Sequence, residues 1–592
     1  MPVDFRNTNS LWASVAVETL VRLGLKTAIL CPGSRSTPLT FAFATHDQID
    51  ALPILDERSA AFFALGCAKQ QHRPVAIVCT SGTAGSNFYP AVIEAYESGV
   101  PLLIFTADRP PEMRDCASGQ TIDQQKLYGR FAKYYSELAV PTVDIELLSY
   151  LRQTLVNGWR QSISPSPGPI HFNCPFRDPL PPIADGSTEG LKDIWNSERF
   201  FAAVGSLDMT MKEVRRRNSF CGESLPIAAW KQCQRGLIIA GSVSPKSPQD
   251  YCALVSELSR QLGWPVLAEG LSPLRNYQSL NDGQSLNDRL ISTYDIILRQ
   301  AKRSTDLIPT MVIQLGELPI SKVLRQWLKV HQPLRWIVGS QKNLDPLHGP
   351  TQGTATSLEG LVDALKLAEK ETAIPLKSDY AQQWLSYEQL IREPLDAQLL
   401  ATPNLVESKV VWLLSQYLPE NTPLFIANSM PVRDVEYFWP VGDRKIQPFF
   451  SRGANGIDGT LSTAMGVSHH NQPTVLLTGD LAFLHDTNGL LNAAKLTGHL
   501  TVVVINNNGG GIFEMLPIAE FAPTFEDYFV TPQQVDVAAL CRAYGVAYQA
   551  IAAPSAFVES IRTLPSEGMR VLEVKCDRKQ SVAQRKALLN IL

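Results

Sequence analysis

Two polar segments that follow apolar runs could together bind a metal ion. Asp480 follows the run 474–477 closely, and Asn507 follows the run 500–505. The Asp480 carboxylate, the Asn507 amide oxygen and the backbone carbonyl of Gly509 would be hard oxygen ligands. Mg²⁺ suits such a set, because it binds through few protein ligands and completes its shell with phosphate oxygens and water.

The spacing of Asp480 and Asn507 allows the two side chains to meet. Taken separately, an Asp after a strand is more often a cap, and an Asn-Gly pair is more often a turn. Asn507 lies 27 positions after Asp480, and a helix expected over 487–495 and one strand fill the gap. A right-handed βαβ crossover would place both side chains at one edge of a parallel sheet. Together they therefore favour a metal–diphosphate site.

Strand and helix patterns that could position these residues alternate along the chain. Apolar strands joined by helices are typical of a parallel sheet covered on both faces, where ligands bind beyond the carboxyl ends of the strands. We expect three doubly wound α/β domains with mainly parallel sheets, over residues 1–185, 186–370 and 371–592. The expected strands are 27–30, 51–55, 75–79, 102–106 and 170–174; then 237–241, 265–268, 311–315 and 336–338; then 424–427, 474–477, 500–505 and 571–574.

Length, composition and charge exclude several classes of protein. With 592 residues, 45% hydrophobic and 19% charged, the chain is neither a small module nor disordered. Its 53 basic and 57 acidic residues give a net charge of -4, so no bulk positive field could hold nucleic acid or an anionic membrane. The apolar runs are strand-length, short of the roughly 20 residues that span a bilayer. No signal peptide is visible, so a cytoplasmic protein is expected.

Cysteine and histidine show no pattern of disulfides or metal ligands. None of the ten cysteines forms a C-x-x-C pair, and the nine histidines show no H-E-x-x-H spacing. Reduced, mostly buried thiols are the expectation for such a chain. We therefore assign no metal site to these residue types.

Five segments together resemble one family of enzymes. Gly479-Asp480, followed after a βαβ unit by Asn506-Asn507, resembles the thiamine-diphosphate enzyme signature, with Leu481 where that signature has Gly. With this signature, four further segments resemble the 2-succinyl-5-enolpyruvyl-6-hydroxy-3-cyclohexene-1-carboxylate synthase (MenD) family: 32–38, 106–112, 451–459 and 506–513. The resemblance runs from about Leu11 to the C-terminal strand. It is dense in the first and last thirds and thin in the middle.

This resemblance implies a reaction, cofactors and an assembly. The reaction is decarboxylation of 2-oxoglutarate and 1,4-addition of the succinyl carbanion to isochorismate, within menaquinone or phylloquinone biosynthesis. The implied cofactors are thiamine diphosphate and Mg²⁺, or Mn²⁺ in its place. The implied assembly is a homodimer or homotetramer with active sites at the subunit interface.

The resemblance also implies roles for individual residues. Glu57 would activate the cofactor bound by another subunit, although a Glu in a first helical turn also interacts favourably with the helix dipole. Asp480, Asn507 and Gly509 would bind the metal and the cofactor. The apolar wall around the cofactor would be Ile512, Phe513 and Leu516. The substrate contacts would be Ser34, Arg35, Arg109, Gln120, Lys322, Ser429, Arg433 and Arg452, where planar Arg side chains suit carboxylates. Val323 follows Lys322, whereas some family members have Arg there.

Two other functions fit parts of these patterns. Another thiamine-diphosphate enzyme, such as an acetohydroxyacid synthase or a 2-oxoacid decarboxylase, would share the signature, but a pyruvate enzyme would need fewer cations. A non-catalytic binding protein of the same fold would not need Glu57, Asp480 and Asn507 together. Turnover of 2-oxoglutarate with isochorismate separates the three functions.

Overall fold

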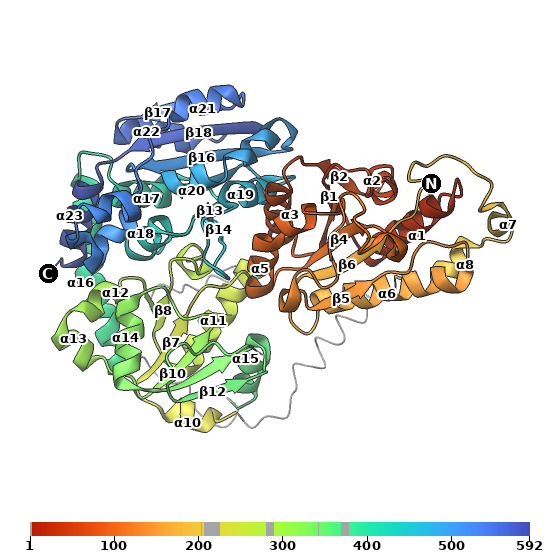
Figure 1. The fold of residues 1–592 in the computed structure, drawn as a ribbon. Coiled ribbons are helices and arrows are strands. Elements are labelled where there is room, and N and C mark those ends of the chain that lie inside the picture. The colour runs from red at the N-terminus through yellow and green to blue at the C-terminus, as the bar shows by residue number, and fades with distance from the viewer. Residues whose placement is uncertain are drawn as a thin grey trace. The chain divides into compact units, whose positions relative to one another are not determined.

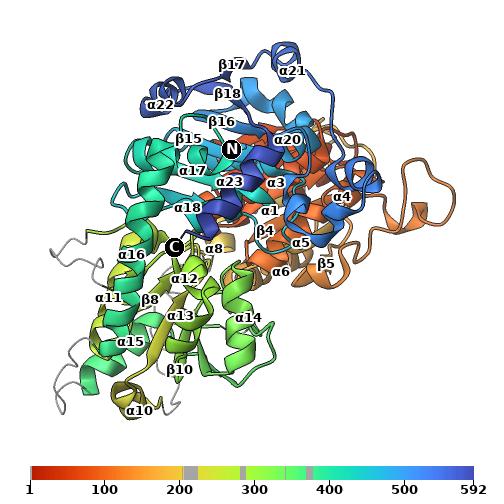
Figure 2. The ribbon, with the colours of Figure 1, turned by 90° about the vertical axis from the view of Figure 1, so that its left-hand side faces the viewer.

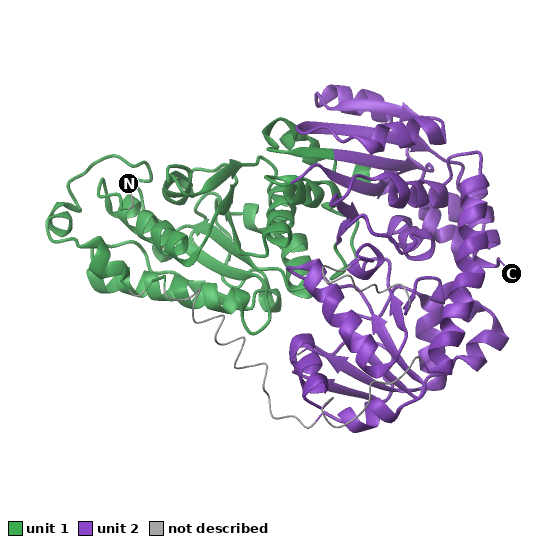
Figure 3. Cartoon of the chain, turned by 180° about the vertical axis from the view of Figure 1, so that it is seen from behind, with its two compact units in different colours: residues 1–213, 451–471, 482–500 green, residues 214–450, 472–481, 501–592 purple. Residues whose placement is uncertain are grey.

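The computed structural model describes residues 3–202, 204–205, 225–279, 289–340, 342–368 and 378–591. The chain forms two compact units (Figure 3). Unit 1 consists of residues 1–213, 451–471 and 482–500, and unit 2 consists of residues 214–450, 472–481 and 501–592. Cys221 lies outside the described residues, and the nine described cysteines are free thiols.

The first of three six-stranded sheets lies in unit 1 (Figure 1). Its strand order is β2-β1-β3-β4-β6-β5, and all neighbours run parallel. The strands are β1 Thr27–Leu30, β2 Asp50–Pro53, β3 Val75–Cys79, β4 Leu102–Asp108, β5 Tyr134–Glu137 and β6 Ile170–Pro175. The helices are α1 Thr8–Leu23, α2 Thr37–Ala44, α3 Glu57–Gln71, α4 Ala84–Asn87, α5 Tyr89–Ser98, α6 Ile145–Ile163, α7 Glu189–Lys192 and α8 Ser197–Phe201.

The second sheet lies in unit 2 and is also parallel throughout, in the order β12-β11-β10-β7-β8-β9. Its strands are β7 Gly236–Ala240, β8 Val266–Ala268, β9 Leu290–Ile291, β10 Met311–Leu315, β11 Leu334–Val338 and β12 Thr351–Thr354. The helices of this region are α10 Ile227–Gln232, α11 Pro248–Leu262, α12 Tyr294–Arg299, α13 Ala301–Asp306, α14 Lys322–His331, α15 Leu358–Leu367 and the long α16 Asp379–Ala401.

The third sheet has the order β14-β13-β15-β16-β18-β17. Its strands are β13 Pro423–Ile426, β14 Gln447–Phe449, β15 Thr474–Gly479, β16 His499–Asn506, β17 Ala547–Ile551 and β18 Gly568–Lys575. Its helices are α17 Glu407–Tyr417, α18 Met430–Phe438, α19 Thr460–Ser468, α20 Asp480–His485, α21 Val537–Ala543, α22 Pro554–Arg562 and α23 Arg578–Leu589. The helix α16 packs against α12 and β9 at one part of its length and against α17 at another (Figure 2).

These sheets confirm the predicted fold class of doubly wound, mainly parallel α/β domains. In the first and third sheets the strand order reverses between β1 and β3 and between β13 and β15. Ligands of such sheets bind at the carboxyl ends of the strands beside such a reversal. The predicted helix over 487–495 is a 3₁₀ helix, Thr487–Lys495, and the unpredicted α20 precedes it. Over the described residues, no helix combines the length and apolar character needed to cross a bilayer.

Within unit 1, α3 and α19 approach each other closely through two glycines. A Cβ atom on Gly66 would lie 2.0 Å from the Thr463 carbonyl oxygen, and one on Gly466 would lie 2.0 Å from the Phe63 carbonyl oxygen. Any larger residue at either position would force the two backbones apart. The pair therefore fixes α3, the helix that begins at Glu57.

His171 on β6 is a buried titratable residue in the first sheet. Its Nε2 lies 2.8 Å from Thr106 Oγ1, and the single hydroxyl hydrogen of Thr106 is donated to Asn173 Oδ1. The ring therefore donates from Nε2, and its buried Nδ1 has no partner among the described residues. Burial lowers the pKa of His171 to about 3, because protonation would place an unpaired cation in the core.

We expect this histidine to make unfolding pH-dependent. The unfolded state binds a proton below about pH 6.5 and the folded state does not, so stability is lost as pH falls. His171 should cost about 1.4 kcal/mol of unfolding free energy for each pH unit below 6.5. Urea unfolding at pH 7 and pH 5 should show a smaller loss for His171→Gln than for the unchanged protein. His348→Gln, at an exposed site, serves as control, and equal losses for His171→Gln and the unchanged protein would contradict the prediction.

Candidate functional site

The carboxyl end of β15 brings a buried carboxylate to a glycine-rich turn. β15 ends at Gly479, and Asp480 begins α20. Asp480 is 5% exposed, and its Oδ2 accepts a hydrogen bond of 2.7 Å from the backbone N–H of Gly509. Burial raises the pKa of Asp480 to about 6, against the lowering effect of that N–H. The predicted neighbours Asp480 and Gly509 therefore lie in contact.

Asn507, at the end of the adjacent strand β16, is held in one orientation. Its Nδ2 donates a hydrogen bond of 2.7 Å to Glu407 Oε1. Because a carboxylate only accepts, the amide must present its NH₂ to Glu407 and its oxygen to the opposite side. That oxygen is buried and has no partner among the described residues. An oriented and unsatisfied amide oxygen is what a metal ion would require of this residue.

The surroundings of Asn507 carry an excess of buried negative charge. Arg585 donates two hydrogen bonds to Asp434, of 2.7 and 2.8 Å, and one of 2.5 Å to Glu407. The charge of Glu407 also acts on Asp480 and helps to raise its pKa. Among the buried groups, the carboxylates of Asp434, Glu407 and Asp480 and the Arg585 guanidinium leave a formal charge of about −2 when all are ionised, and the half-buried Arg433 also acts on Asp434. A divalent cation is the species that this set of donors fits.

The Gly509 turn requires glycine for two reasons. Gly509 has φ +133°, and a Cβ atom there would lie 2.5 Å from the Val530 carbonyl oxygen. At Gly511, a Cβ atom would lie 2.6 Å from Asn507 Nδ2. The Gly509 carbonyl also accepts a hydrogen bond of 2.9 Å from Gly511, and a carbonyl has a second lone pair for another ligand. The backbone can thus approach the Asn507 side chain closely.

The predicted apolar wall follows this turn. Ile512, Phe513 and Leu516 are half-buried, and the first two lie on the 3₁₀ helix Gly511–Met515. Arg578 of α23 donates to Glu514 at 2.7 Å and also pairs with Glu526, so it ties the turn and the following segment to the C-terminal helix.

Four predicted substrate residues lie in the segments that follow β1 and β4 in unit 1. Ser34 is exposed after β1, whereas the neighbouring Arg35 is buried and donates to the Phe176 carbonyl at 2.8 Å. Arg109, after β4, donates to Ser81 Oγ at 2.6 Å, and Gln120 donates to the Ser81 carbonyl at 2.9 Å.

The two arginines of this group act on each other. Burial and then the positive charge of Arg35 lower the pKa of Arg109. The charges of Asp178, which pairs with Arg35 at 3.3 Å, and of Asp108 oppose this effect only in part, and a cation disfavoured by a second cation is suited to an anionic ligand.

Glu57 is the first residue of α3, and three residues separate it from the end of β2. Asp56 caps the helix by accepting a hydrogen bond of 3.1 Å from the Ser59 N–H. The Glu57 side chain is half-buried, and its charge helps to raise the pKa of the buried thiols Cys31 and Cys79 after burial itself. The capped helix start and the glycine contact with α19 fix this carboxyl group at the sheet edge.

Ser429 has a strained backbone. Its φ of 71° and ψ of −128° form a conformation that costs a non-glycine residue on the order of 1–3 kcal/mol. Its carbonyl accepts a hydrogen bond of 2.6 Å from Arg433 Nη1, one turn into α18. Both predicted residues therefore share one helix start after β13.

The two remaining predicted residues lie in different units. Lys322, in unit 2, is exposed at the first position of α14. Arg452 lies in unit 1, in a loop whose N–H groups at Gly453 and Ala454 donate to the buried Glu94 carboxylate at 3.1 and 2.6 Å. Unit 1 thus contains Ser34, Arg35, Glu57, Arg109, Gln120 and Arg452, and unit 2 contains Lys322, Ser429, Arg433, Asp480, Asn507, Gly509, Ile512, Phe513 and Leu516.

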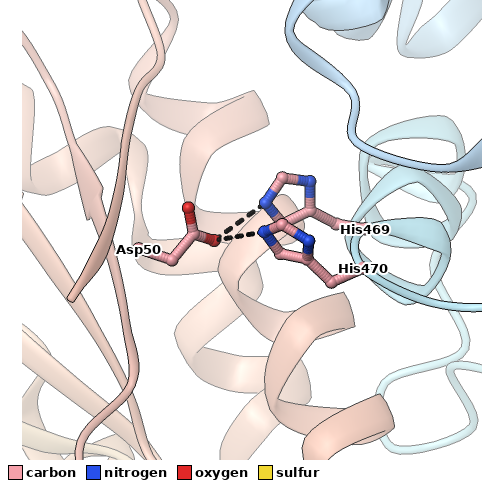
Figure 4. Close-up of side chains that lie close together, drawn as sticks. All are labelled: Asp50, His469 and His470. Carbon is pink, nitrogen blue, oxygen red and sulfur yellow. Dashed lines mark hydrogen bonds and ion pairs between the residues drawn. The ribbon is translucent and has the colours of Figure 1, made fainter. Parts of the chain in front are cut away.

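A second group of side chains with metal-ligand chemistry lies in unit 1. Asp50 Oδ2 is 2.9 Å from His469 Nε2 and 3.2 Å from His470 Nε2 (Figure 4). His469 Nδ1 accepts a hydrogen bond of 3.4 Å from the Thr497 N–H, so Nε2 carries the proton and donates it to Asp50. That hydrogen bond is the main cause of a lowered pKa of Asp50. Because His469 Nε2 carries a proton, these side chains link β2 to the end of α19 through a hydrogen bond.

The sequence analysis missed the residues that orient Asn507, namely Glu407, Asp434 and Arg585. They lie on three helices and have no local motif. A weak signal exists in α23, where Arg585 occupies a core-facing position between Val582 and Leu588. A charged residue at a helix position where the periodic pattern has apolar residues indicates a buried ion pair.

Comparison with known proteins agrees with this geometry. The model of the thiamine pyrophosphate enzyme N-terminal TPP binding domain matches residues 12–127, and the middle domain of such enzymes matches 210–426. The C-terminal TPP binding domain matches residues 435–574. The chain therefore carries the domains of a thiamine diphosphate enzyme.

Curated relatives match nearly the whole chain. A 2-succinyl-5-enolpyruvyl-6-hydroxy-3-cyclohexene-1-carboxylate synthase of Acaryochloris marina is 52% identical over 99% of this chain and 98% of that protein. The synthase of the same name from a Nostoc species is 54% identical over 98% of this chain and 97% of that protein. The Synechococcus elongatus synthase is 50% identical over 99% and 97%.

Proposed function

Because this chain belongs to the 2-succinyl-5-enolpyruvyl-6-hydroxy-3-cyclohexene-1-carboxylate synthase family, we propose that it catalyses the reaction of that name. In this reaction 2-oxoglutarate loses CO₂ and its remaining four-carbon unit adds to isochorismate. The product enters menaquinone or phylloquinone biosynthesis. The observation that carries the proposal is the similarity at about half of all positions over nearly the full length. The free thiols are compatible with action in the cytoplasm.

The proposed cofactors are thiamine diphosphate and Mg²⁺, which Mn²⁺ could replace. When bound, thiamine diphosphate supplies the nucleophilic carbon and the electron sink for decarboxylation. Asp480, the Asn507 amide oxygen and the Gly509 carbonyl would hold the metal against the diphosphate. The excess of buried negative charge and the unsatisfied Asn507 oxygen support this assignment. Ile512, Phe513 and Leu516 would exclude water from the cofactor.

The proposed role of Glu57 is to share a proton with the pyrimidine ring nitrogen of the cofactor. This carboxyl lies in unit 1, whereas the metal residues lie in unit 2. We propose that, as the family resemblance implies, Glu57 serves the site of another subunit in a homodimer or homotetramer.

The cations of both units would bind the carboxylates of the substrates. Each substrate carries two carboxylates, so both need cationic partners. The positive charge of Arg35 helps to lower the pKa of Arg109, and a bound dicarboxylate would offset that repulsion. Ser34, Gln120 and Arg452 would complete the contacts from unit 1, and Lys322, Ser429 and Arg433 those from unit 2.

A turnover assay tests this function directly. With thiamine diphosphate and Mg²⁺, the protein should release CO₂ from 2-oxoglutarate and consume isochorismate in equal amounts. Pyruvate should be a poor competing donor, because its single carboxylate leaves cations without a partner. Efficient turnover of pyruvate would instead support an acetohydroxyacid synthase or decarboxylase, and cofactor binding without any turnover would support a binding protein.

Glu57→Gln should separate cofactor binding from cofactor activation. The amide keeps the size of the side chain but cannot hand over a carboxyl proton. Thiamine diphosphate should still bind, while exchange of its C2 proton should slow by roughly 10²-fold or more, as for loss of a positioned acid. Exchange is measured by NMR after acid quench. Unchanged exchange would leave Glu57 with the role of a first-turn residue alone.

Arg109→Ala and Arg433→Ala should affect different substrates. Isochorismate is held only by non-covalent contacts, so Arg109, outside the cofactor-anchoring domain, is assigned to it. Arg433, on α18 of that domain, is assigned to 2-oxoglutarate. Arg109→Ala should raise the KM for isochorismate by roughly 10- to 150-fold, equivalent to ~1.5–3 kcal/mol for one charge-assisted contact, with little change for 2-oxoglutarate. Arg433→Ala should show the reverse.

Steady-state kinetics with each substrate varied in turn measure this division. Arg177→Ala is the matched control, because Arg177 is an exposed arginine that pairs with Glu112. Equal effects of Arg109→Ala and Arg433→Ala on the KM values of both substrates would refute this assignment.

A further inference from the structure

The Asn507 amide oxygen faces the proposed metal position because a hydrogen bond to the amide NH₂ group fixes the orientation of the side chain. An Asn side chain can rotate by 180° about its last bond and exchange O for NH₂ at little intrinsic cost. An NH₂ group cannot bind a cation. Some partner must therefore determine which end of the amide faces the metal position.

Glu407 is that partner. It is the first residue of α17 and 2% exposed, and each of its two oxygens accepts from a different residue. Oε1 accepts from Asn507 Nδ2 at 2.7 Å, and Oε2 accepts from Arg585 Nη2 at 2.5 Å. Arg585 can only donate hydrogen bonds, so the Glu407 oxygen that it contacts is an acceptor.

Arg585 is fixed in turn. It is fully buried on α23, and Asp434 of α18 accepts from its Nε at 2.7 Å and from its Nη2 at 2.8 Å. This two-point contact sets the plane of the guanidinium. Three helices thus converge on one amide, all within unit 2.

We propose that Glu407, held by Arg585 and Asp434, is a positioning residue that sets the orientation of the Asn507 amide for metal binding. The proposal rests on the proposed function, in which Asn507 is a metal ligand. Glu407 is given this indirect role because its two oxygens already accept hydrogen bonds from Asn507 and Arg585.

Replacing the acceptor should reverse the amide. In Glu407→Gln the new side chain would have one oxygen and one NH₂ group, and the charged Arg585 should take the oxygen. The new NH₂ group would then face Asn507, which would turn its own oxygen toward that group and its NH₂ toward the metal position. Glu407→Gln should therefore weaken Mg²⁺ binding by roughly 10- to 100-fold, the range for loss of a group that orients a ligand.

Asn507→Asp should also weaken Mg²⁺ binding, although it adds a negative charge to a cation site. The new carboxylate would face the Glu407 carboxylate, so two acceptors would oppose each other without a proton. In the double variant Glu407→Gln/Asn507→Asp, the introduced amide NH₂ would donate to the introduced carboxylate, whose other oxygen remains for the metal. The double variant should therefore bind Mg²⁺ more tightly than either single variant, a coupling that general destabilisation would not produce.

Calorimetry with Mg²⁺ titrated into protein saturated with thiamine diphosphate measures these affinities without turnover. The matched control is Glu573→Gln. Glu573 is 3% exposed and accepts from Asn506 Nδ2 at 2.6 Å, so it holds the preceding amide in a similar way. Glu573→Gln should lower the melting temperature and leave the Mg²⁺ affinity unchanged.

The outcomes distinguish this inference from the proposed function. If Asp480→Ala keeps metal-dependent cofactor binding, the metal site is wrong and the inference fails with it. If Asp480→Ala loses that binding while Glu407→Gln keeps it, the positioning role alone is wrong. Should Glu407→Gln not fold, Asn507→Asp decides, because tighter Mg²⁺ binding by this variant would overturn the proposed orientation.

Discussion

The structure of the candidate site depends on the buried Glu407 carboxylate, whose position must be fixed and whose charge must be offset by hydrogen-bond donors. Glu407 receives the Arg585 guanidinium on one side and the Asn507 amide on the other. Removing such a charge from water costs several kcal/mol, which is offset only when each oxygen has a good partner. The arrangement determines the order of donors and acceptors from α23 to the end of β16. It leaves one acceptor, Asn507 Oδ1, aimed away from the network.

The doubly wound sheets explain where these groups lie. In parallel sheets the carboxyl ends of adjacent strands share one edge, so the residues after β13, β15 and β16 converge although they are distant in sequence. The same rule brings the loops after β1, β3 and β4 together in the first sheet. One rule of topology therefore brings Arg35 and Arg109 to one sheet edge in unit 1 and Asp480 and Asn507 to one sheet edge in unit 2.

The sequence predicted central strands better than edge strands, for a physical reason. All five missed strands, β5, β9, β12, β14 and β17, are edges of their sheets. An edge strand is paired on one side and is often half-exposed, so its residues need not form a continuous apolar run. β17, for example, has only one buried residue, Ile551. The central strand β3, Val75–Cys79, is buried at every position, and its bounds were predicted without error.

The contacts of the site were predictable only where one strand end supplies them. Asp480 and Asn507 follow the adjacent strands β15 and β16, so their location at one edge of the sheet followed from topology alone. Glu407, Asp434 and Arg585 meet through three helices separated by up to 178 residues, and no sequence period encodes that contact. This holds for buried polar networks in general. Each member can be recognised in the sequence as a charged residue at a core-facing helical position, but its partners depend on how the helices pack. In this chain the C-terminal helix illustrates it. Arg578 and Arg585 lie two turns apart on α23; Arg578 contacts Glu514 after the Gly509 turn, and Arg585 contacts Glu407, the acceptor of the Asn507 amide.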